Sequence, residues 1–206
     1  MFSDAYTTIE DGQAVPLIEK LNEKLDGSAF DAHKVRVISH SLPFYNGYFL
    51  YEVSDFESEP TRVISFIAKE GEPDLFVLDG TNEPLYALNK AVPIFLNTEV
   101  APIYARFFFY YVRGRFGRFN IIDNVDEINW REEPSPAGRK ALSKMINPMV
   151  LDNEDKAGTY HLRASIIFKD SLFASDVSVE ENGTVSLNNQ EMLVEDIPVL
   201  DDSFGQ

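Results

Sequence analysis

The stretch that decides the fold is ARFFFYYVRGRFGRFN, residues 105–120. It holds four arginines and seven aromatic residues but no acidic residue, in a chain whose formal net charge is −16. Counted from Tyr104, apolar residues recur at spacings of 3, 4, 7 and 8, which places them on one helical face. The members of this face are Phe107, Phe108, Tyr111 and Val112. We therefore expect a helix over 98–113 whose apolar face packs on a sheet, with each large buried side chain contributing about 1.5–3 kcal/mol.

The other side of this helix and the segment after it carry the arginines. Glycines at 114 and 117 allow tight turning and close backbone approach, so we expect an Arg-Gly turn after the helix. The candidate ligand-binding residues are Arg106, Tyr110, Arg113, Arg115 and Arg118. Guanidinium groups beside exposed N–H groups are suited to a carboxylate, a phosphate or an acidic protein segment.

The same arginines have an alternative role inside the protein. They would then bond the chain's own acids, such as Asp123 or the acidic C-terminal run, and each exposed pair would contribute only ~0–1 kcal/mol. RGRFGR is not a phosphate-binding loop of the G-K-[ST] type, and it follows a helix where such a loop would precede one. From the sequence both roles stay open.

Composition indicates an intracellular globular protein. The chain has 206 residues, 44% of them hydrophobic and 13% aromatic, so we expect a single compact unit over 1–206. The absence of cysteine excludes disulfides, thiolate zinc sites and cysteine nucleophiles. The N-terminus lacks the features of a signal peptide, and the longest apolar stretch, residues 100–112, contains Arg106 and is too short to span a bilayer. We expect a cytoplasmic location and no membrane partner.

The charge distribution limits the partners further. Thirty-four acidic residues stand against 18 lysines and arginines, so we expect no binding to nucleic acid or to anionic membranes. No basic residue follows Lys169, whereas nine acidic residues do. We interpret residues 197–206 as an acidic tail, although the apolar side chains of Ile197, Val199 and Leu200 would allow its first part to dock.

Hydrophobic periodicity and turn residues predict the remaining elements. A helix is expected over 15–25, beginning at Asp11 or Gly12 and ending at Gly27, and another over 136–146. Strands are expected at 34–39, 47–56, 62–70, 74–80, 118–123, 158–168, 171–180 and 184–188. Asn182-Gly183 predicts a hairpin with a type I′ turn. The fold class is therefore α+β, with an antiparallel, curved sheet and about three helices.

The element order also suggests an internal duplication. Residues 14–95 and 135–196 would be two helix-plus-meander halves joined by the helix at 98–113. Ordinary β-hairpin similarity is the alternative. The layout resembles small helix-on-curved-sheet folds of the cystatin-like or nuclear-transport-factor-like kind. The likeness lies in element order and no motif carries it, so it transfers no functional residue.

Motifs for chemistry are absent from the sequence. None of the three histidines has metal-ligand spacing, and no G-x-S-x-G nucleophile motif is present. LDNEDKAG, residues 151–158, resembles a calcium loop, but Ala157 replaces the sixth-position glycine and Arg163 the twelfth-position glutamate. We therefore expect no metal, no cofactor and no catalytic residue.

Three functional hypotheses follow. The leading one is a non-enzymatic cytoplasmic binding or assembly module that uses the aromatic helix and the Arg-Gly turn to contact an anionic small molecule or acidic partner, and that forms homo-oligomers through strand edges or the helix. The second is a small-molecule enzyme or carrier with a pocket inside the curved sheet, where His40, His161 or a tyrosine is the polar group. The third is an acidic decoy that binds a basic partner through the tail.

Overall fold

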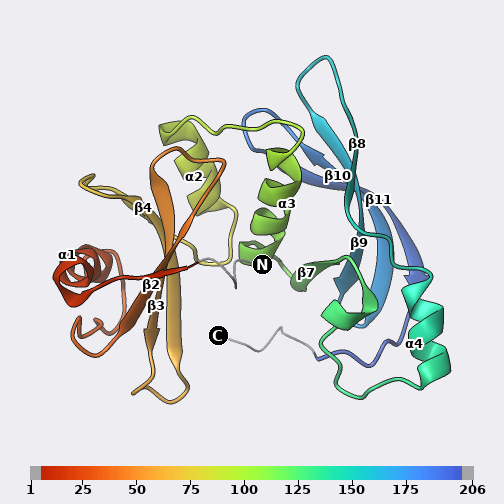
Figure 1. Ribbon diagram of the computed structural model, residues 1–206, viewed down its shortest axis with the longest axis horizontal. Coiled ribbons are helices and arrows are strands. Elements are labelled where there is room, and N and C mark those ends of the chain that lie inside the picture. The colour runs from red at the N-terminus through yellow and green to blue at the C-terminus, as the bar shows by residue number, and fades with distance from the viewer. Residues whose placement is uncertain (1–5, 201–206) are drawn as a thin grey trace. The chain divides into compact units, whose positions relative to one another are not determined.

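The computed structural model describes residues 6–200, and contacts within the chain divide these into two compact units (Figure 1). Unit 1 comprises residues 6–79 and 83–95, and unit 2 comprises residues 80–82 and 96–200. The strands form two separate sheets, which hydrophobic periodicity cannot reveal because it does not say which strands pair. The single compact unit over 1–206 stays a prediction.

Unit 1 is an antiparallel sheet of five strands that follow one another in the chain. The order is β1 (Thr7–Thr8), β2 (Arg36–Ser41), β3 (Tyr48–Asp55), β4 (Arg62–Lys69) and β5 (Leu75–Val77). The helix α1 (Asp11–Asn22) precedes β2, and α2 (Glu83–Ala91) follows β5.

One core of unit 1 lies between α1 and the sheet. Ala14, Ile18 and Leu21 of α1 are spaced by four and three residues, so they share the helical face that is buried. They pack with residues that alternate along the strands, among them Val37, Tyr51, Val53, Phe66 and Ala68. The alternation places every second side chain of these strands on the α1 side of the sheet.

Unit 2 begins with the aromatic helix and continues as a six-stranded sheet. Its helices are α3 (Val100–Tyr111), a 3-10 turn (Val125–Glu127) and α4 (Pro136–Ser143). Its strands are β6 (Arg113–Gly114), β7 (Gly117–Ile122), β8 (Val150–Glu154), β9 (Tyr160–Phe168), β10 (Ser171–Val179) and β11 (Val185–Val194). The order is β11-β10-β9-β7-β6. The strand β8 pairs with the first part of β9, residues 160–163, and β7 pairs with its last part, residues 165–168.

The predicted fold class is confirmed: the protein is α+β, and its sheets are antiparallel and strongly curved (Figure 1). Four α-helices occur in the described part of the chain, one more than expected. The missed helix is α2, which is only nine residues long and buries only Leu85 and Leu88. The strand β11 continues to Val194, beyond the predicted end at 188. The prediction stopped early because residues 189–191 are polar and exposed and break the alternating pattern.

The Asn182-Gly183 hairpin forms, with Val179 opposite Val185, but its predicted type I′ turn is wrong. Such a turn needs positive φ at both residues, whereas only Gly183 has it, at 80°. The Gly183 N–H donates to the Glu180 carbonyl and the Glu180 N–H to Thr184, which is the pattern of a longer loop that ends in a left-handed glycine.

The two sheets share an order of elements that bears on the proposed duplication. In unit 1, α1 precedes four neighbouring strands, β2 to β5, and in unit 2, α3 precedes β7, β9, β10 and β11, which are also neighbours in that order. The helix that leads the second sheet is thus α3 and not the helix at 136. Duplication of residues 14–95 and 135–196 stays a prediction.

The predicted acidic tail begins with a docked segment. Ile197 and Val199 belong to the core of unit 2 and are only 3% and 8% exposed, and Val199 forms a β-bridge with Trp130. The Leu200 N–H donates to the Asn129 carbonyl at 2.8 Å. Residues 201–206 lie outside the described residues. Between residues 6 and 200, no helix has both the length and the apolar character needed to cross a membrane.

We predict that Ile197→Ala lowers the free energy of unfolding by about 2–5 kcal/mol, because it leaves a cavity in the core of unit 2. Leu200→Ala, three residues away and 54% exposed, is the matched control and should change it by less than about 0.5 kcal/mol. Denaturant unfolding followed by circular dichroism measures both. Equal effects of the two variants would contradict the docking of this segment.

Candidate functional site

Most of the predicted aromatic face of α3 is buried, whereas Tyr111 and Val112 are only partly so. Tyr104 and Phe107 are fully buried and Phe108 nearly so, and the Tyr104 hydroxyl donates to the Gly183 carbonyl at 3.0 Å. The Asn97 side chain accepts from the N–H groups of Glu99 and Val100, which caps the first turn. The buried face and the capped first turn hold α3 in place. The helix ends at Tyr111, and the arginine-rich segment follows directly.

The expected Arg-Gly turn is a β-hairpin formed by β6 and β7. Arg113 pairs with Arg118 and Gly114 with Gly117, so Arg115 and Phe116 form the tip. A Cβ at Gly114 would lie 2.6 Å from the Phe119 ring, and Gly117 has a φ of 143°. Both positions therefore require glycine, the first for space and the second for its backbone conformation.

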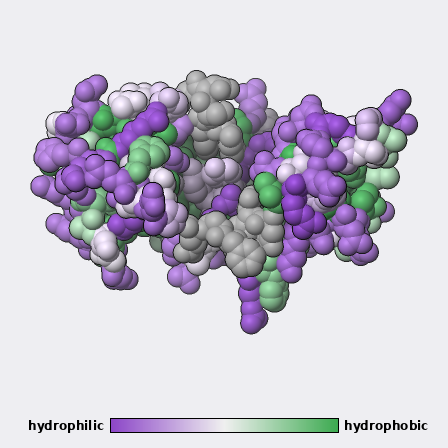
Figure 2. Space-filling view, turned by 90° about the horizontal axis from the view of Figure 1, so that it is seen from below, coloured by the Kyte–Doolittle hydropathy of each residue, from purple (hydrophilic) through white to green (hydrophobic). Residues whose placement is uncertain are grey.

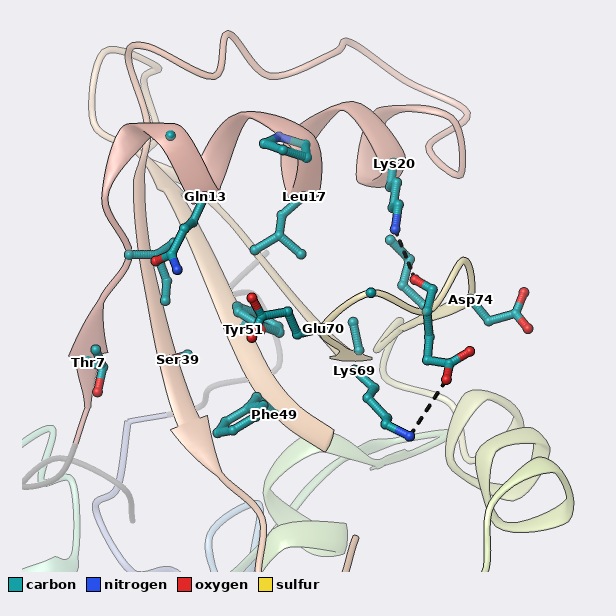
Figure 3. A pocket seen from close by; sticks show the side chains of 17 residues that line it. Thr7, Gln13, Leu17, Lys20, Ser39, Phe49, Tyr51, Lys69, Glu70 and Asp74 are labelled. Carbon is teal, nitrogen blue, oxygen red and sulfur yellow. Dashed lines mark hydrogen bonds and ion pairs between the residues drawn. The ribbon is translucent and has the colours of Figure 1, made fainter. Parts of the chain in front are cut away.

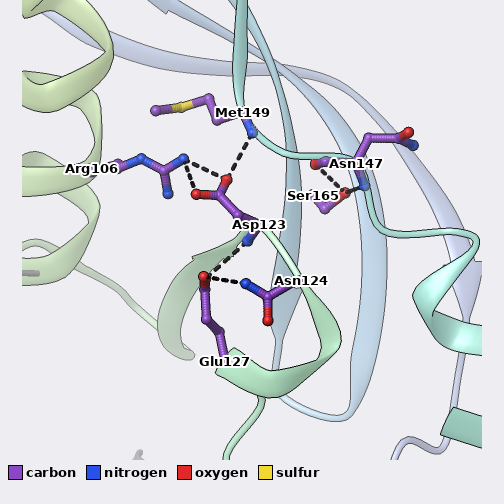
Figure 4. Close-up of polar contacts among 7 residues, drawn as sticks. All are labelled: Arg106, Asp123, Asn124, Glu127, Asn147, Met149 and Ser165. Atoms are coloured by element: carbon purple, nitrogen blue, oxygen red, sulfur yellow. Dashed lines mark hydrogen bonds and ion pairs between the residues drawn. The ribbon is translucent and has the colours of Figure 1, made fainter.

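Arg106 pairs with one of the protein's own acids (Figure 4). Its Nη2 donates to both carboxylate oxygens of Asp123, at 2.5 and 2.7 Å. Asp123 Oδ1 also accepts from the Met149 N–H at 2.9 Å, and the Asp123 N–H donates to Glu127 Oε2. For Arg106 the structure thus favours the role inside the protein that the sequence left open.

Arg113 also has partners within the protein. Its N–H donates to the Gly80 carbonyl at 2.8 Å, and the residue takes part in a further interaction. We therefore do not count its charge as available to a ligand.

The remaining candidates form two cation–aromatic contacts at the β6–β7 hairpin, and one of these also includes a residue that the sequence analysis did not select. We define the cationic–aromatic cluster as Tyr110, Arg115, Phe116, Arg118 and Lys169. The Arg115 guanidinium lies 5.4 Å from the centre of the Phe116 ring, and Lys169 Nζ lies 5.7 Å from the same centre. The Arg118 guanidinium lies 5.4 Å from the centre of the Tyr110 ring.

Packing between two hairpins creates the cluster. Phe119 of β7 stacks on Phe168 of β9, with ring centres 4.5 Å apart and planes 16° from parallel. Lys169 directly follows Phe168 at the β9–β10 turn and has a φ of 55°. The stack therefore brings Lys169 to the β6–β7 hairpin, across 50 residues of sequence.

The positive charges of the cluster are not neutralised by ion pairs inside the described part of the chain. Among residues 6–200, none of Arg115, Arg118 and Lys169 takes part in an ion pair. Asp170 is adjacent in sequence, but its carboxylate accepts from the Ser171 hydroxyl at 3.2 Å. Arg118 Nε is buried without a hydrogen-bond partner. The arrangement can receive an anion without first breaking an internal pair.

In the sequence, the one signal that could have marked Lys169 as a candidate is its place in a predicted hairpin turn. The predicted strands at 158–168 and 171–180 leave Lys169 and Asp170 as a two-residue turn. That signal places Lys169 at a sheet end, but not beside Phe116, because the pairing of β7 with β9 is a tertiary contact.

Within each unit, the hydrophobic residues coloured in Figure 2 lie scattered among hydrophilic ones. Phe116 is one of the large hydrophobic residues with high exposure, at 64%. This exposure leaves the Phe116 ring accessible to a ligand at the cluster.

The histidines and the calcium-like segment considered from the sequence have contacts within the protein. His161 Nε2 lies 3.1 Å from Asp155 Oδ2 on an exposed turn, and His40 is buried with its ring edge against Tyr6. In the calcium-like segment, the Asp155 carboxylate accepts from the N–H groups of Ala157 and Thr159. No group of three or more potential metal ligands occurs in the described part of the chain.

The Asp155 turn generates a prediction about pH. The Thr159 N–H and then the His161 side chain hold the pKa of Asp155 below its ordinary value. A depressed folded-state pKa stabilises the protein above the unfolded-state pKa of about 4, and this contribution is lost as pH falls through the folded-state pKa. Asp155→Asn should therefore lower the thermal midpoint at pH 7, and its difference from the parent protein should shrink below pH ~4.

Glu191→Gln, on the exposed β11, is the control and should show no such pH-dependent difference. Thermal unfolding between pH 2 and 7 measures both variants. A constant difference for Asp155→Asn over that range would show that the carboxylate's charge does not matter.

The Arg106 pair generates a second prediction. Asp123→Ala should lower the free energy of unfolding by about 1–3 kcal/mol, because it leaves a partly buried guanidinium and the Met149 N–H without their acceptor. Asp126→Ala, which removes a 77% exposed partner of Arg139, should cost only ~0–1 kcal/mol. Urea unfolding compares them, and an Asp123→Ala effect no larger than that of Asp126→Ala would contradict the assignment.

Comparisons with known proteins identify no relative: no protein-family model matches the chain, and neither curated proteins nor solved structures gave a match. The functional argument therefore depends on the site alone.

Proposed function

We propose that this protein is a non-enzymatic binding module that receives an anionic small molecule or an acidic protein segment at the cationic–aromatic cluster. One observation carries the proposal. Arg115 and Lys169 converge on the exposed Phe116 ring, at 5.4 and 5.7 Å, and neither they nor Arg118 has an ion-pair partner among residues 6–200. A surface that has not recruited the abundant internal acids is available to an external one.

The geometry gives the anion a favourable place. Arg115 and Lys169 approach the same Phe116 ring, so two positive charges repel each other across a small surface. Each cation–π contact offsets this repulsion by about 0.5–1 kcal/mol. An anion between the two cations converts the repulsion into two attractions, and a guanidinium can bind a carboxylate or phosphate through two parallel hydrogen bonds.

The contact surface is smaller than the one proposed from the sequence. Of the aromatic helix it uses Tyr110, whose ring is 47% exposed, and it does not use Arg106 or Arg113. The net charge of −16 repels an anion at long range, but at 0.1 M salt charges more than about 10 Å away are largely screened. Contact with the cluster then dominates.

The second function considered, a small-molecule enzyme or carrier, is supported in its carrier form by a pocket in unit 1 that Tyr51 lines. Neither His40 nor His161 lines that pocket, so the enzymatic form has less support. The cytoplasmic location, the homo-oligomer and the decoy role of the tail stay predictions. Two register shifts in the pairing of β10 with β11 would oppose strand addition at the β11 edge.

The experiment uses a fluorescein-labelled hexaglutamate peptide and inorganic tripolyphosphate as probes. At 0.1 M salt, the triple variant Arg115→Ala, Arg118→Ala, Lys169→Ala should bind each about 10–30-fold more weakly, because three surface charge contacts contribute about 0.5–0.7 kcal/mol each. Raising the salt to 1 M, where the Debye length is about 3 Å, should abolish binding to the parent protein. Fluorescence anisotropy follows the peptide, and calorimetry follows tripolyphosphate.

A charge-matched control separates the cluster from net charge. Arg131→Ala, Lys140→Ala, Lys144→Ala removes three exposed cations elsewhere in unit 2 and should leave both affinities within about twofold. Equal loss in the two triple variants, or no binding of either probe by the parent protein at 0.1 M salt, would overturn the proposal.

A further inference from the structure

Unit 1 has a pocket that the proposed anion site does not use. It has a volume of about 500 Å³ and lies where α1 approaches the sheet, with the β4–β5 connection as its rim (Figure 3). All of its lining residues belong to unit 1. The volume is within the range of about 300–1,000 Å³ that is typical of small-molecule sites.

The inner wall of the pocket is apolar and aromatic. Leu17 extends from α1, and Phe49, Tyr51 and Ala68 come from neighbouring strands of the sheet (Figure 3). Phe49 and Tyr51 alternate on β3, so they present their rings on the same face, with ring centres 6.4 Å apart. A flat or elongated apolar group fits against these two rings.

Tyr51 supplies a hydroxyl at this wall. Within residues 6–200 that hydroxyl has no hydrogen-bond partner, while the ring itself stacks on Phe66 with centres 5.2 Å apart. Burial, and then the negative charge of Glu70, raises the pKa of Tyr51, so the phenol is neutral at pH 7. The hydroxyl is available to a ligand as donor or acceptor.

The charged groups at the rim differ in whether they have partners. Both lysines are directed to Glu72: Lys20 Nζ donates to its backbone carbonyl at 2.9 Å, and Lys69 Nζ lies 3.6 Å from its carboxylate (Figure 3). Glu70 has no ion-pair partner among the described residues, and its side chain lies beside the Tyr51 ring (Figure 3). Asp74 points away from the cavity.

We infer that this pocket binds an organic cation, a small amine with an apolar body that packs on Phe49 and Tyr51 while its ammonium group pairs with Glu70. The faces of the two rings carry partial negative charge and attract the same ammonium group. The two lysines already contact Glu72, so their positive charges affect a ligand in the pocket less than the negative charge of Glu70 does. An anionic ligand would meet Glu70 directly, so the pocket discriminates against it.

The inference is independent of the anion-binding proposal, which concerns residues of unit 2 only. The full chain is titrated with three probes that share an indole ring: tryptamine, which is cationic at pH 7, tryptophol, which is neutral, and indole-3-propionate, which is anionic. Amide chemical shifts in NMR spectra locate binding. We expect tryptamine to shift residues of β3 and α1 and to bind about tenfold more tightly than tryptophol, with indole-3-propionate weakest.

Two substitutions test the roles of charge and space separately. Glu70→Gln keeps the shape of the side chain and should remove the preference for tryptamine over tryptophol while leaving tryptophol affinity unchanged. Asp74→Asn is the matched control on the same rim and should change each affinity by less than about twofold. Gln13→Trp, at an exposed position of α1 that lines the pocket, should weaken all three probes by filling the space.

The fold of each variant is verified from its amide spectrum, so a loss of binding is not mistaken for unfolding. Equal binding of the three probes, tightest binding of indole-3-propionate, retention of the preference in Glu70→Gln, or no shifts in unit 1 at millimolar tryptamine would each overturn the inference.

Discussion

The burial of the aromatic face of α3 constrains everything that follows it in unit 2. Once Tyr104, Phe107 and Phe108 are withdrawn from water, the helix cannot rotate without exposing side chains worth about 1.5–3 kcal/mol each. The chain therefore leaves the helix in one direction, with Val112 already extended. The next residues form a hairpin. Gly114 leaves room for the Phe119 ring, and Gly117 adopts a positive φ. The tip of the hairpin consists of Arg115 and Phe116.

Electrostatics then separates arginines that look equivalent in the sequence. Arg106 meets Asp123, which a backbone N–H also holds, and the resulting pair is partly buried. Arg115, Arg118 and Lys169 meet aromatic rings instead of acids. Because an exposed ion pair contributes little, nothing in folding compels the acids of this chain to neutralise those three cations. The difference between the two groups is one of local geometry and not of composition.

The two candidate sites combine aromatic rings with charges of opposite sign. Each has aromatic rings next to charged side chains. Among the described residues, the Glu70 carboxylate beside the pocket's rings has no ion-pair partner in unit 1, and the cations of the cluster have none in unit 2. In both cases the aromatic surface supplies contact area, whereas the charge decides which ligand is accepted. A net charge of −16 therefore describes the chain and not its individual surfaces.

The sequence by itself determined the α+β class, the helix at 98–113, most strands to within a few residues and the Arg-Gly turn, because periodicity, caps and glycines act locally. It missed α2 and the strands β1, β6 and β8, whose patterns are short. Tertiary structure decided the division into two sheets, the pairing of Arg106 with Asp123, and the arrival of Lys169 beside Phe116. These depend on contacts between residues distant in the chain, which no local pattern encodes.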